Sequence, residues 1–140
     1  MDSKMIYHLF VKCKPAAQPR TRKGKYGNIY NPGTADVWKE AIQASFLLAG
    51  ARRKDTISGP VVLEMKFLFY VSEKCRKASP HTTKPDIDNL VKSVMDALKG
   101  IEIYKDDCRV CGIYAQKFWT NEKDGEGMYI KVSRVENECK

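Results

Sequence analysis

The sequence predicts an α+β domain with a mixed β-sheet of about four strands and two main helices. Two windows carry apolar residues at helical spacing, and four others are short, rich in β-branched and aromatic residues, and bounded by turn-forming residues. Their order along the chain is strand, helix, strand, helix, strand, strand. With 140 residues, the chain is expected to fold as a single domain, 1–140, with a hydrophobic core of its own.

The first strand and the first helix are separated by a long polar segment. We expect a strand over residues 6–12, a basic loop over 14–33, and an amphipathic helix over 35–49. Long loops in compact domains are often functional. Trp38 lies on the apolar stripe of the helix, so we place it in the core, although its ring could also stack on a nucleobase.

Three further strands are expected. Residues 61–71 have strong β composition and predict a central strand, and a basic loop over 72–85 follows it, in which His81 is interpreted as a solvated residue. Residues 109–119 and 128–135 predict two more strands. Because a turn containing Asp-Gly joins these last two, we expect them to form a hairpin.

The second helix is expected from Asp88 to Lys99, with Gly100 as its C-terminal stop. Its apolar residues recur at the spacing of one helical face and predict one continuous buried stripe. The residues of this stripe are Ile87, Leu90, Val91, Val94, Met95 and Leu98.

Charge and targeting signals indicate the class of partner. The formal net charge is +8, and the basic residues are clustered, which is typical of proteins that bind a phosphate backbone but also of a merely solvated basic surface. The chain has no apolar run long enough to span a membrane and no signal peptide, so we expect a cytoplasmic protein. The five cysteines, including Cys108 and Cys111 at zinc-like spacing, are then expected to be free thiols.

Two basic segments are candidates for contacts with a nucleic acid. In loop 14–33, Tyr26 and Tyr30 are interleaved with cations, a pattern that suits an arm holding phosphates and stacking on bases. The alternative is a loop that its tyrosines pin to the core. The candidate nucleic-acid-binding residues are Arg20, Arg22, Lys23, Lys25, Arg76 and Lys77.

Acidic residues gather between Lys84 and Asp107. This stretch holds six of the 17 acidic residues of the chain, namely Asp86, Asp88, Asp96, Glu102, Asp106 and Asp107. In an extended approach to the helix, Asp86 and Asp88 project to the same side. Asp88, Lys92 and Asp96 are spaced i, i+4, i+8 and form one polar ridge along it. Acidic residues gathered in a basic protein indicate a cation site that faces a polyanion.

A divalent metal would explain this arrangement. If strand 109–119 packs beside the second helix, Asp106 or Asp107 would meet Asp86 and Asp88. Three carboxylates about 6 Å apart repel by roughly 3 kcal/mol per pair at an effective dielectric near 20, and a cation relieves this repulsion. Oxygen ligands favour Mg²⁺ or Mn²⁺, which can activate water against a phosphodiester, while a nearby lysine holds the phosphate.

Each part of the stretch also has a purely structural explanation. An aspartate can cap the helix, an Asp-Lys-Asp row can form surface ion pairs, and aspartates are common in turns. An Asp-x-Asp pair also occurs in metal-dependent glycosyltransferases and phosphatases.

Taken together, the motifs resemble the RusA family of Holliday junction resolvases. The run Asp86-Ile-Asp88-Asn89-Leu-Val-Lys92, then Asp96-Ala-Leu98, then Asp106-Asp107 before a strand follows the pattern of that family. The early Pro19-Arg20-x-Arg22, followed by a basic loop and Tyr30, is also similar. The resemblance covers residues 5–135 or so.

The resemblance implies a RusA-like fold and a homodimeric endonuclease that cuts four-way DNA junctions with Mg²⁺ or Mn²⁺. Asp86, Asp88 and Asp107 match its metal-binding catalytic carboxylates, and Lys92 matches its catalytic lysine. Asp106 is a further candidate ligand. Two paired cuts need two sites, and two chains related by a twofold axis would supply them.

Two other functions remain open at this point. The chain could be a non-catalytic DNA-binding or replication-associated module with a structural acidic ridge, or a Mg²⁺ nuclease that acts on flaps or forks.

Overall fold

The computed structural model of the chain describes residues 2–15, 22–23, 29–30, 34–73 and 81–136. No helix in these ranges has the length and hydropathy that a bilayer span needs. The strands are β1 (Asp2–Val11), β2 (Arg22–Lys23), β3 (Ile29–Tyr30), β4 (Val61–Tyr70), β5 (Val110–Thr120) and β6 (Gly127–Glu136). The helices are α1 (Thr34–Leu48) and α2 (Ile87–Gly100), with short 3₁₀ turns at Arg53–Asp55, Asp107–Arg109 and Lys123–Gly125.

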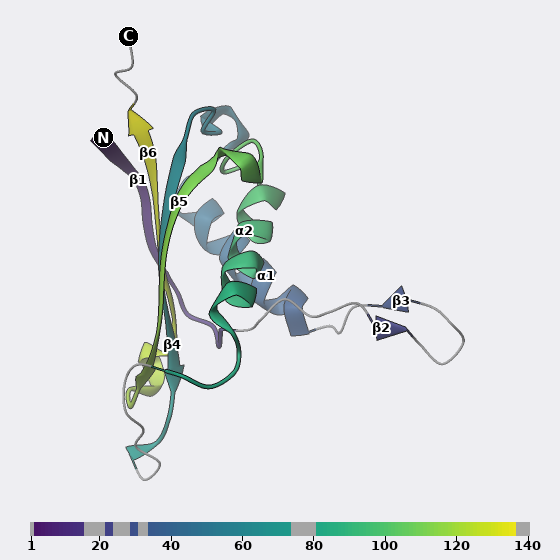
Figure 1. Cartoon of the computed structure of the whole chain (residues 1–140), viewed down its shortest axis with the longest axis vertical. Helices are drawn as coiled ribbons and strands as arrows, with labels where there is room; N and C mark the ends of the chain where they lie inside the picture. The colour runs from purple at the N-terminus through teal and green to yellow at the C-terminus, as the bar shows by residue number, and fades with distance from the viewer. Residues whose placement is uncertain (1, 16–21, 24–28, 31–33, 74–80, 137–140) are drawn as a thin grey trace.

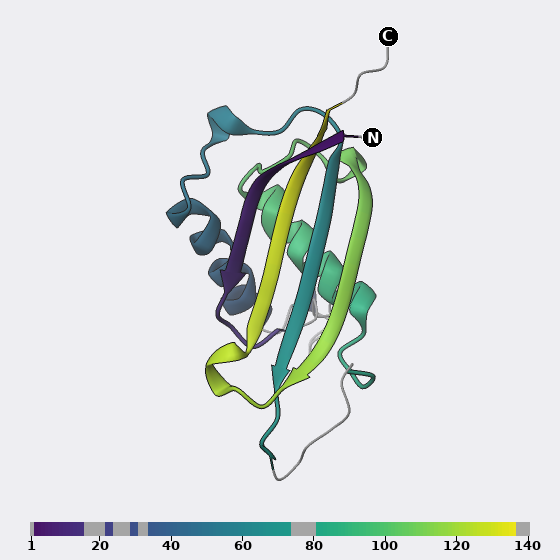
Figure 2. The same cartoon turned by 90° about the vertical axis from the view of Figure 1, so that its left-hand side faces the viewer.

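Four of the strands form one mixed sheet, as predicted, in the order β1-β6-β4-β5. β4 pairs in parallel with β5, and β6 pairs antiparallel with both β1 and β4 (Figure 2). The expected central position of β4 is confirmed.

The predicted hairpin between β5 and β6 is wrong, because β4 lies between these two strands. Residues 121–126 cross the end of β4, where the backbone N–H of Tyr70 donates to Glu126 Oε2 at 2.7 Å. A crossing of two strand spacings covers about 10 Å, which six residues span easily. β4, on which alternate side chains are buried, therefore has a paired strand on each side.

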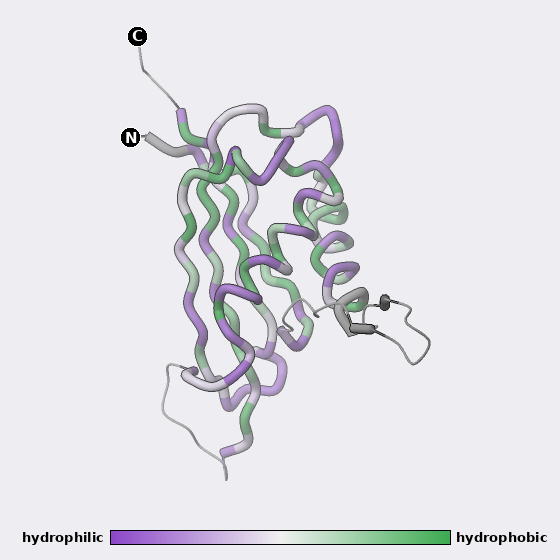
Figure 3. Tube along the Cα trace, turned by 45° about the vertical axis from the view of Figure 1, so that its right-hand side comes forward, coloured by the Kyte–Doolittle hydropathy of each residue, from purple (hydrophilic) through white to green (hydrophobic). Residues whose placement is uncertain are grey.

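Both helices cover the same face of this sheet (Figures 1 and 2). The core lies between the two layers, where apolar segments from sheet and helices face each other (Figure 3). On β4 the buried residues alternate, as the twofold repeat of a strand requires: Val61, Leu63, Met65, Phe67 and Phe69. Trp38 of α1 is 2% exposed, which confirms its prediction as a core residue.

Helix α2 buries one side against this core. Leu90, Val94 and Leu98 are fully buried, in agreement with the predicted stripe. Ile87 was also placed in that stripe, and this is wrong: it is 37% exposed, because the first turn of the helix lies at the rim of the core. Ala97 is fully buried instead.

The basic segment 14–33 was predicted as a loop, but a short ribbon lies within it. β2 pairs antiparallel with β3, with Arg22 opposite Tyr30 and Lys23 opposite Ile29. Figure 1 shows this ribbon apart from the four-stranded sheet, on the side of the helices.

We expect Leu98→Ala to lower the free energy of unfolding by about 2–5 kcal/mol, because it opens a cavity between α2 and the sheet. Urea denaturation measures the change. Leu48→Ala is the matched control: Leu48 is 90% exposed, so its truncation should change stability by no more than about 0.5 kcal/mol. Equal effects of the two substitutions would contradict the assigned core.

Candidate functional site

The two aspartates at the start of α2 are exposed to solvent. Asp86 occupies the N-cap position with an extended backbone, and its carbonyl accepts the hydrogen bond of the Leu90 N–H at 3.2 Å. Its side chain, however, makes no capping hydrogen bond. Asp88 lies in the first turn. Both carboxylates sit at the positive end of the helix dipole. Because its side chain makes no capping hydrogen bond, the Asp86 carboxylate is not used to cap the helix.

Lys92 lies one turn beyond Asp88 on the exposed side of α2. It takes part in none of the ion pairs found within 4.0 Å among the described residues, so the Asp-Lys-Asp row is not a row of salt bridges. Four residues of helix rise by about 6 Å, which would place the lysine beside a phosphate bound near Asp88. Asp96, the last member of the ridge, is half-buried.

Asp106 has structural partners at the turn before β5. Its side chain accepts the hydrogen bond of the Asp107 N–H at 2.8 Å and so caps the 3₁₀ turn Asp107–Arg109. The same carboxylate lies 3.5 Å from Lys99 Nζ.

Asp107 is held by a buried tyrosine. The Tyr104 hydroxyl lies 3.3 Å from Asp107 Oδ1 and 3.1 Å from the carbonyl oxygen of Met95, and these two acceptors share its single proton. Tyr104 is fully buried. Burial raises the pKa of its phenol, and the negative charges of Asp107 and Asp96 raise that pKa further. Asp107 thus belongs to the part of the site near the C-terminal half of α2.

The structure does not bring Asp86, Asp88 and Asp107 together. Among the described residues, no three His, Cys, Asp or Glu side chains form a group that could hold a metal ion. The geometry of α2 explains the separation: Asp107 lies near Met95, and Met95 is seven residues, or about 10 Å along the axis, from Asp88. Asp86 and Asp88 lie at the start of the helix, and Asp107 shares Tyr104 as a partner with Met95 in a later turn.

The residues at the start of α2 are of the type that binds a hard cation. Mg²⁺ is usually bound by one or two carboxylates, with water and substrate phosphate oxygens completing its octahedron. Asp86 and Asp88 offer two exposed carboxylates without a capping role. Asp107 accepts its hydrogen bond from Tyr104 on Oδ1, and its predicted part as a ligand stays a prediction.

The chain just before Asp86 is fastened to β5. His81 is 4% exposed and stacks on Trp119 with ring centroids 4.0 Å apart. Its interpretation as a solvated residue is therefore wrong. Lys117 Nζ donates to the carbonyls of Thr83 and Pro85 at 2.7 and 2.8 Å. The structural role of Lys117 was not predicted from the sequence. A lysine two residues before Trp119 lies on the same side of the strand as that ring, and lysine is unusual on a core-facing side.

The predicted DNA-binding residues have no described side chains. Arg20, Lys25, Arg76 and Lys77 lie outside the described residues. Arg22 and Lys23 are placed as the backbone of β2.

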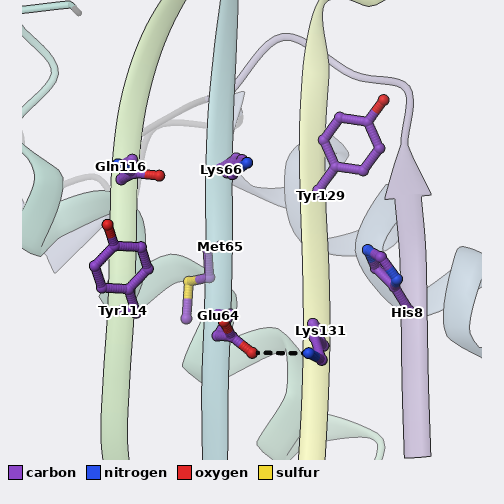
Figure 4. A pocket seen from close by; sticks show the side chains of 8 residues that line it. All are labelled: His8, Glu64, Met65, Lys66, Tyr114, Gln116, Tyr129 and Lys131. Atoms are coloured by element: carbon purple, nitrogen blue, oxygen red, sulfur yellow. Dashed lines mark ion pairs between the residues drawn. The ribbon is translucent and has the colours of Figure 1, made fainter. Parts of the chain in front are cut away.

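The face of the sheet that the helices do not cover carries the pocket shown in Figure 4. Glu64 and Lys131 form an ion pair of 3.2 Å there, and Tyr114 and Tyr129 flank it from β5 and β6. No residue of the predicted catalytic set lines this pocket.

Comparison with known proteins identifies relatives of the chain. The family model for endodeoxyribonuclease RusA matches residues 12–133. The uncharacterized protein YqaN of Bacillus subtilis (strain 168) is 34% identical over 135 residues, covering 86% of this chain and 92% of its own length. The crossover junction endodeoxyribonuclease rusA of Lactococcus phage r1t is 31% identical over 58 residues, covering 41% of this chain and 44% of its own.

Tyr104→Phe tests the contact that holds Asp107. The pKa of Tyr104 is raised above its ordinary 10.0, so the folded protein keeps a proton that the unfolded chain releases as the pH rises past that value. This stabilisation is complete below about pH 10 and is lost as the pH climbs toward the folded pKa. We expect Tyr104→Phe to cost about 1 kcal/mol at pH 7 and to make the alkaline loss of stability less steep.

Urea denaturation at pH 7 to about 10.5 measures both effects. Tyr70→Phe, at an exposed tyrosine, is the control and should leave the pH dependence as it is in the wild type. If Tyr104→Phe and the wild type lost stability with pH in the same way, the raised pKa of Tyr104 would be contradicted.

Proposed function

The chain belongs to the RusA family of endodeoxyribonucleases, which act on junction DNA, and from this we propose that it resolves four-way (Holliday) junctions by paired symmetric phosphodiester cuts. We propose that the hydrolysis depends on Mg²⁺, for which Mn²⁺ can substitute. We further propose that the protein acts in DNA recombination and repair, in the cytoplasm.

One observation supports the proposal above the others. The exposed edge of α2 presents two carboxylates without a capping role, followed one turn later by a lysine without an ion-pair partner. Acidic and basic groups left unpaired with one another on one helix face gain nothing from ion pairing, but they suit binding of a cation and a phosphate side by side.

Each residue has a part in the proposed reaction. Asp86 and Asp88 would hold Mg²⁺, with Asp107 as the third carboxylate of the set. The metal ion, when bound, supplies an activated water and neutralises charge on the leaving oxygen. Lys92 contacts the scissile phosphate and stabilises the negative charge that develops on it.

The basic segments would hold the arms of the junction. Arg20, Arg22, Lys23, Lys25, Arg76 and Lys77 are proposed as phosphate contacts. Binding of this kind releases counterions, so the affinity should fall steeply with salt.

A second copy of the chain would supply the second cut. The sheet face away from the helices is not covered by any described element, and it exposes Tyr114 and Tyr129 by 59% and 43% (Figures 1 and 4). Charges of both signs lie between these apolar side chains, including Glu64 and Lys66. Such a surface can be complementary to itself across a twofold axis, and we propose it as the homodimer interface.

The nuclease activity is tested with labelled four-way, flap and linear DNA, in Mg²⁺ and in EDTA. We expect symmetric nicks in the four-way junction only, and only with Mg²⁺. Cutting confined to flaps would instead favour a different nuclease function, and binding without cutting would favour a non-catalytic module.

Asp88→Asn should lower the rate of junction cleavage by about 10³-fold or more, because it removes a metal ligand. Junction binding, measured by gel shift, should persist or improve, because a negative charge near the phosphates is lost. Asp124→Asn, at a 94% exposed side chain, is the control and should cleave like the wild type. Loss of binding as well as cleavage in folded Asp88→Asn would argue against a purely catalytic role.

The interface is tested by light scattering after size exclusion. We expect twice the 16.0 kDa mass of one chain for the wild type and a monomer for Tyr114→Glu combined with Tyr129→Glu. Leu48→Glu, at an exposed position of α1, should remain dimeric. A dimeric double variant would refute this interface, and a monomeric wild type bound to junction DNA would refute the homodimer.

A further inference from the structure

We propose that Lys117 and His81 are positioning residues of the nuclease site, which hold the segment before α2 against β5 and so fix the direction of the Asp86 carboxylate. The inference rests on the proposed function. We call Lys117, His81 and the carbonyls of Thr83 and Pro85 the Lys117 clamp.

One ammonium group holds the end of the segment. Lys117 Nζ donates to Thr83 O at 2.7 Å and to Pro85 O at 2.8 Å, distances typical of charge-assisted hydrogen bonds. Lys117 takes part in no ion pair within the described ranges, so these carbonyls are the polar partners that its charge has there. Pro85 directly precedes Asp86. A partly buried lysine on a strand is costly without such partners, and the carbonyls explain its presence.

The beginning of the segment is held by a ring stack. The backbone N–H of His81 donates to the backbone carbonyl of Lys117 at 3.0 Å, and the imidazole ring of His81 lies 4.0 Å from the ring of Trp119, tilted by only 25°. The ring of Phe69, on the neighbouring strand β4, lies 4.3 Å from His81. Residues 81 and 85 are thus both fastened to the same short part of β5.

Asp86 depends on this fastening more than Asp88 does. Asp88 lies inside α2, whose direction is set by the packing of Leu90 and Val94 in the core. Asp86 lies outside the helix with φ −70° and ψ 143°, so its carboxylate points where the preceding segment places it. A displacement of about 1 Å in a catalytic group can cost 100-fold in rate.

The first experiment measures the clamp without DNA. Lys117→Met keeps the length of the side chain and removes its donors, and Lys117→Arg restores charge and donors. In hydrogen–deuterium exchange, we expect the peptide amides of residues 81–89 to exchange faster in Lys117→Met, with those of residues 90–98 unchanged and Lys117→Arg closer to the wild type. Lys123→Met, at an exposed lysine, removes the same charge and should leave both regions unchanged. Unchanged exchange at residues 81–89 in Lys117→Met would overturn the clamp.

The second experiment separates binding from chemistry. At saturating protein, single-turnover cleavage of a four-way junction by Lys117→Met should be about 10- to 100-fold slower, while its dissociation constant for the junction changes less than about threefold. Lys117→Arg should recover part of the rate. Faster exchange with an unchanged cleavage rate would overturn the positioning role. An inactive wild type would overturn the proposed function and the catalytic half of the inference, and the exchange result would still decide whether the clamp holds Asp86.

A histidine variant tests the other end of the clamp. His81→Phe keeps an aromatic ring for stacking on Trp119 and should stay closer to the wild type than His81→Ala in both experiments. His81→Ala removes the stack and should reproduce the exchange and rate changes of Lys117→Met. Thermal melts of both variants show whether the fold is kept. Wild-type exchange and rate in folded His81→Ala would remove His81 from the clamp.

Discussion

The burial of one side of α2 against the sheet is the constraint on which the rest of the structure depends. Leu90, Val94, Ala97 and Leu98 are fully buried, so the helix has only one rotation about its axis that satisfies the core. That rotation leaves Asp88 and Lys92 exposed on the other side. The same packing that stabilises the fold therefore also determines where its polar ridge lies.

The charges around this helix divide into structural and available groups. Asp106 caps a turn and lies beside Lys99, and Asp107 accepts a hydrogen bond from Tyr104. Asp86, by contrast, stands at a helix N-cap without making the capping bond, which is worth about 1 kcal/mol where it is formed. A local stabilising interaction left unmade at the motif of a nuclease family is what a functional carboxylate would show.

The main elements were predictable because their signals are local. Both helices and all four strands of the main sheet lie within a few residues of their predicted bounds, because helical and strand periodicity shows which side of each element is buried. The hairpin of β5 and β6 was wrong because strand order depends on which strand takes the centre of the sheet, and a turn motif carries no information about this. The buried stack of His81 on Trp119 joins residues far apart in sequence, so composition predicted a solvated loop instead.

For the candidate site, the exposure of the residues on α2 was predictable, and the spatial arrangement of the carboxylates was not. Spacing along one helix correctly placed Asp88 and Lys92 on a common exposed side. The distance from Asp88 to Asp107 depends on how residues 101–107 pack, and there the buried Tyr104 draws Asp107 toward Met95. The contacts of Lys117 could not be predicted because its partners are main-chain carbonyls, which every residue carries and no sequence pattern marks.

The most direct test of the site is to find where a divalent cation binds. Mn²⁺ is paramagnetic and broadens the amide signals of nearby residues in an NMR spectrum of ¹⁵N-labelled protein. We predict that the signals of residues 86–92 broaden first as Mn²⁺ is added, and that excess Mg²⁺ restores them. Broadening centred on other acidic residues, such as Glu64 or Glu122, with residues 86–92 unaffected, would contradict the proposed site.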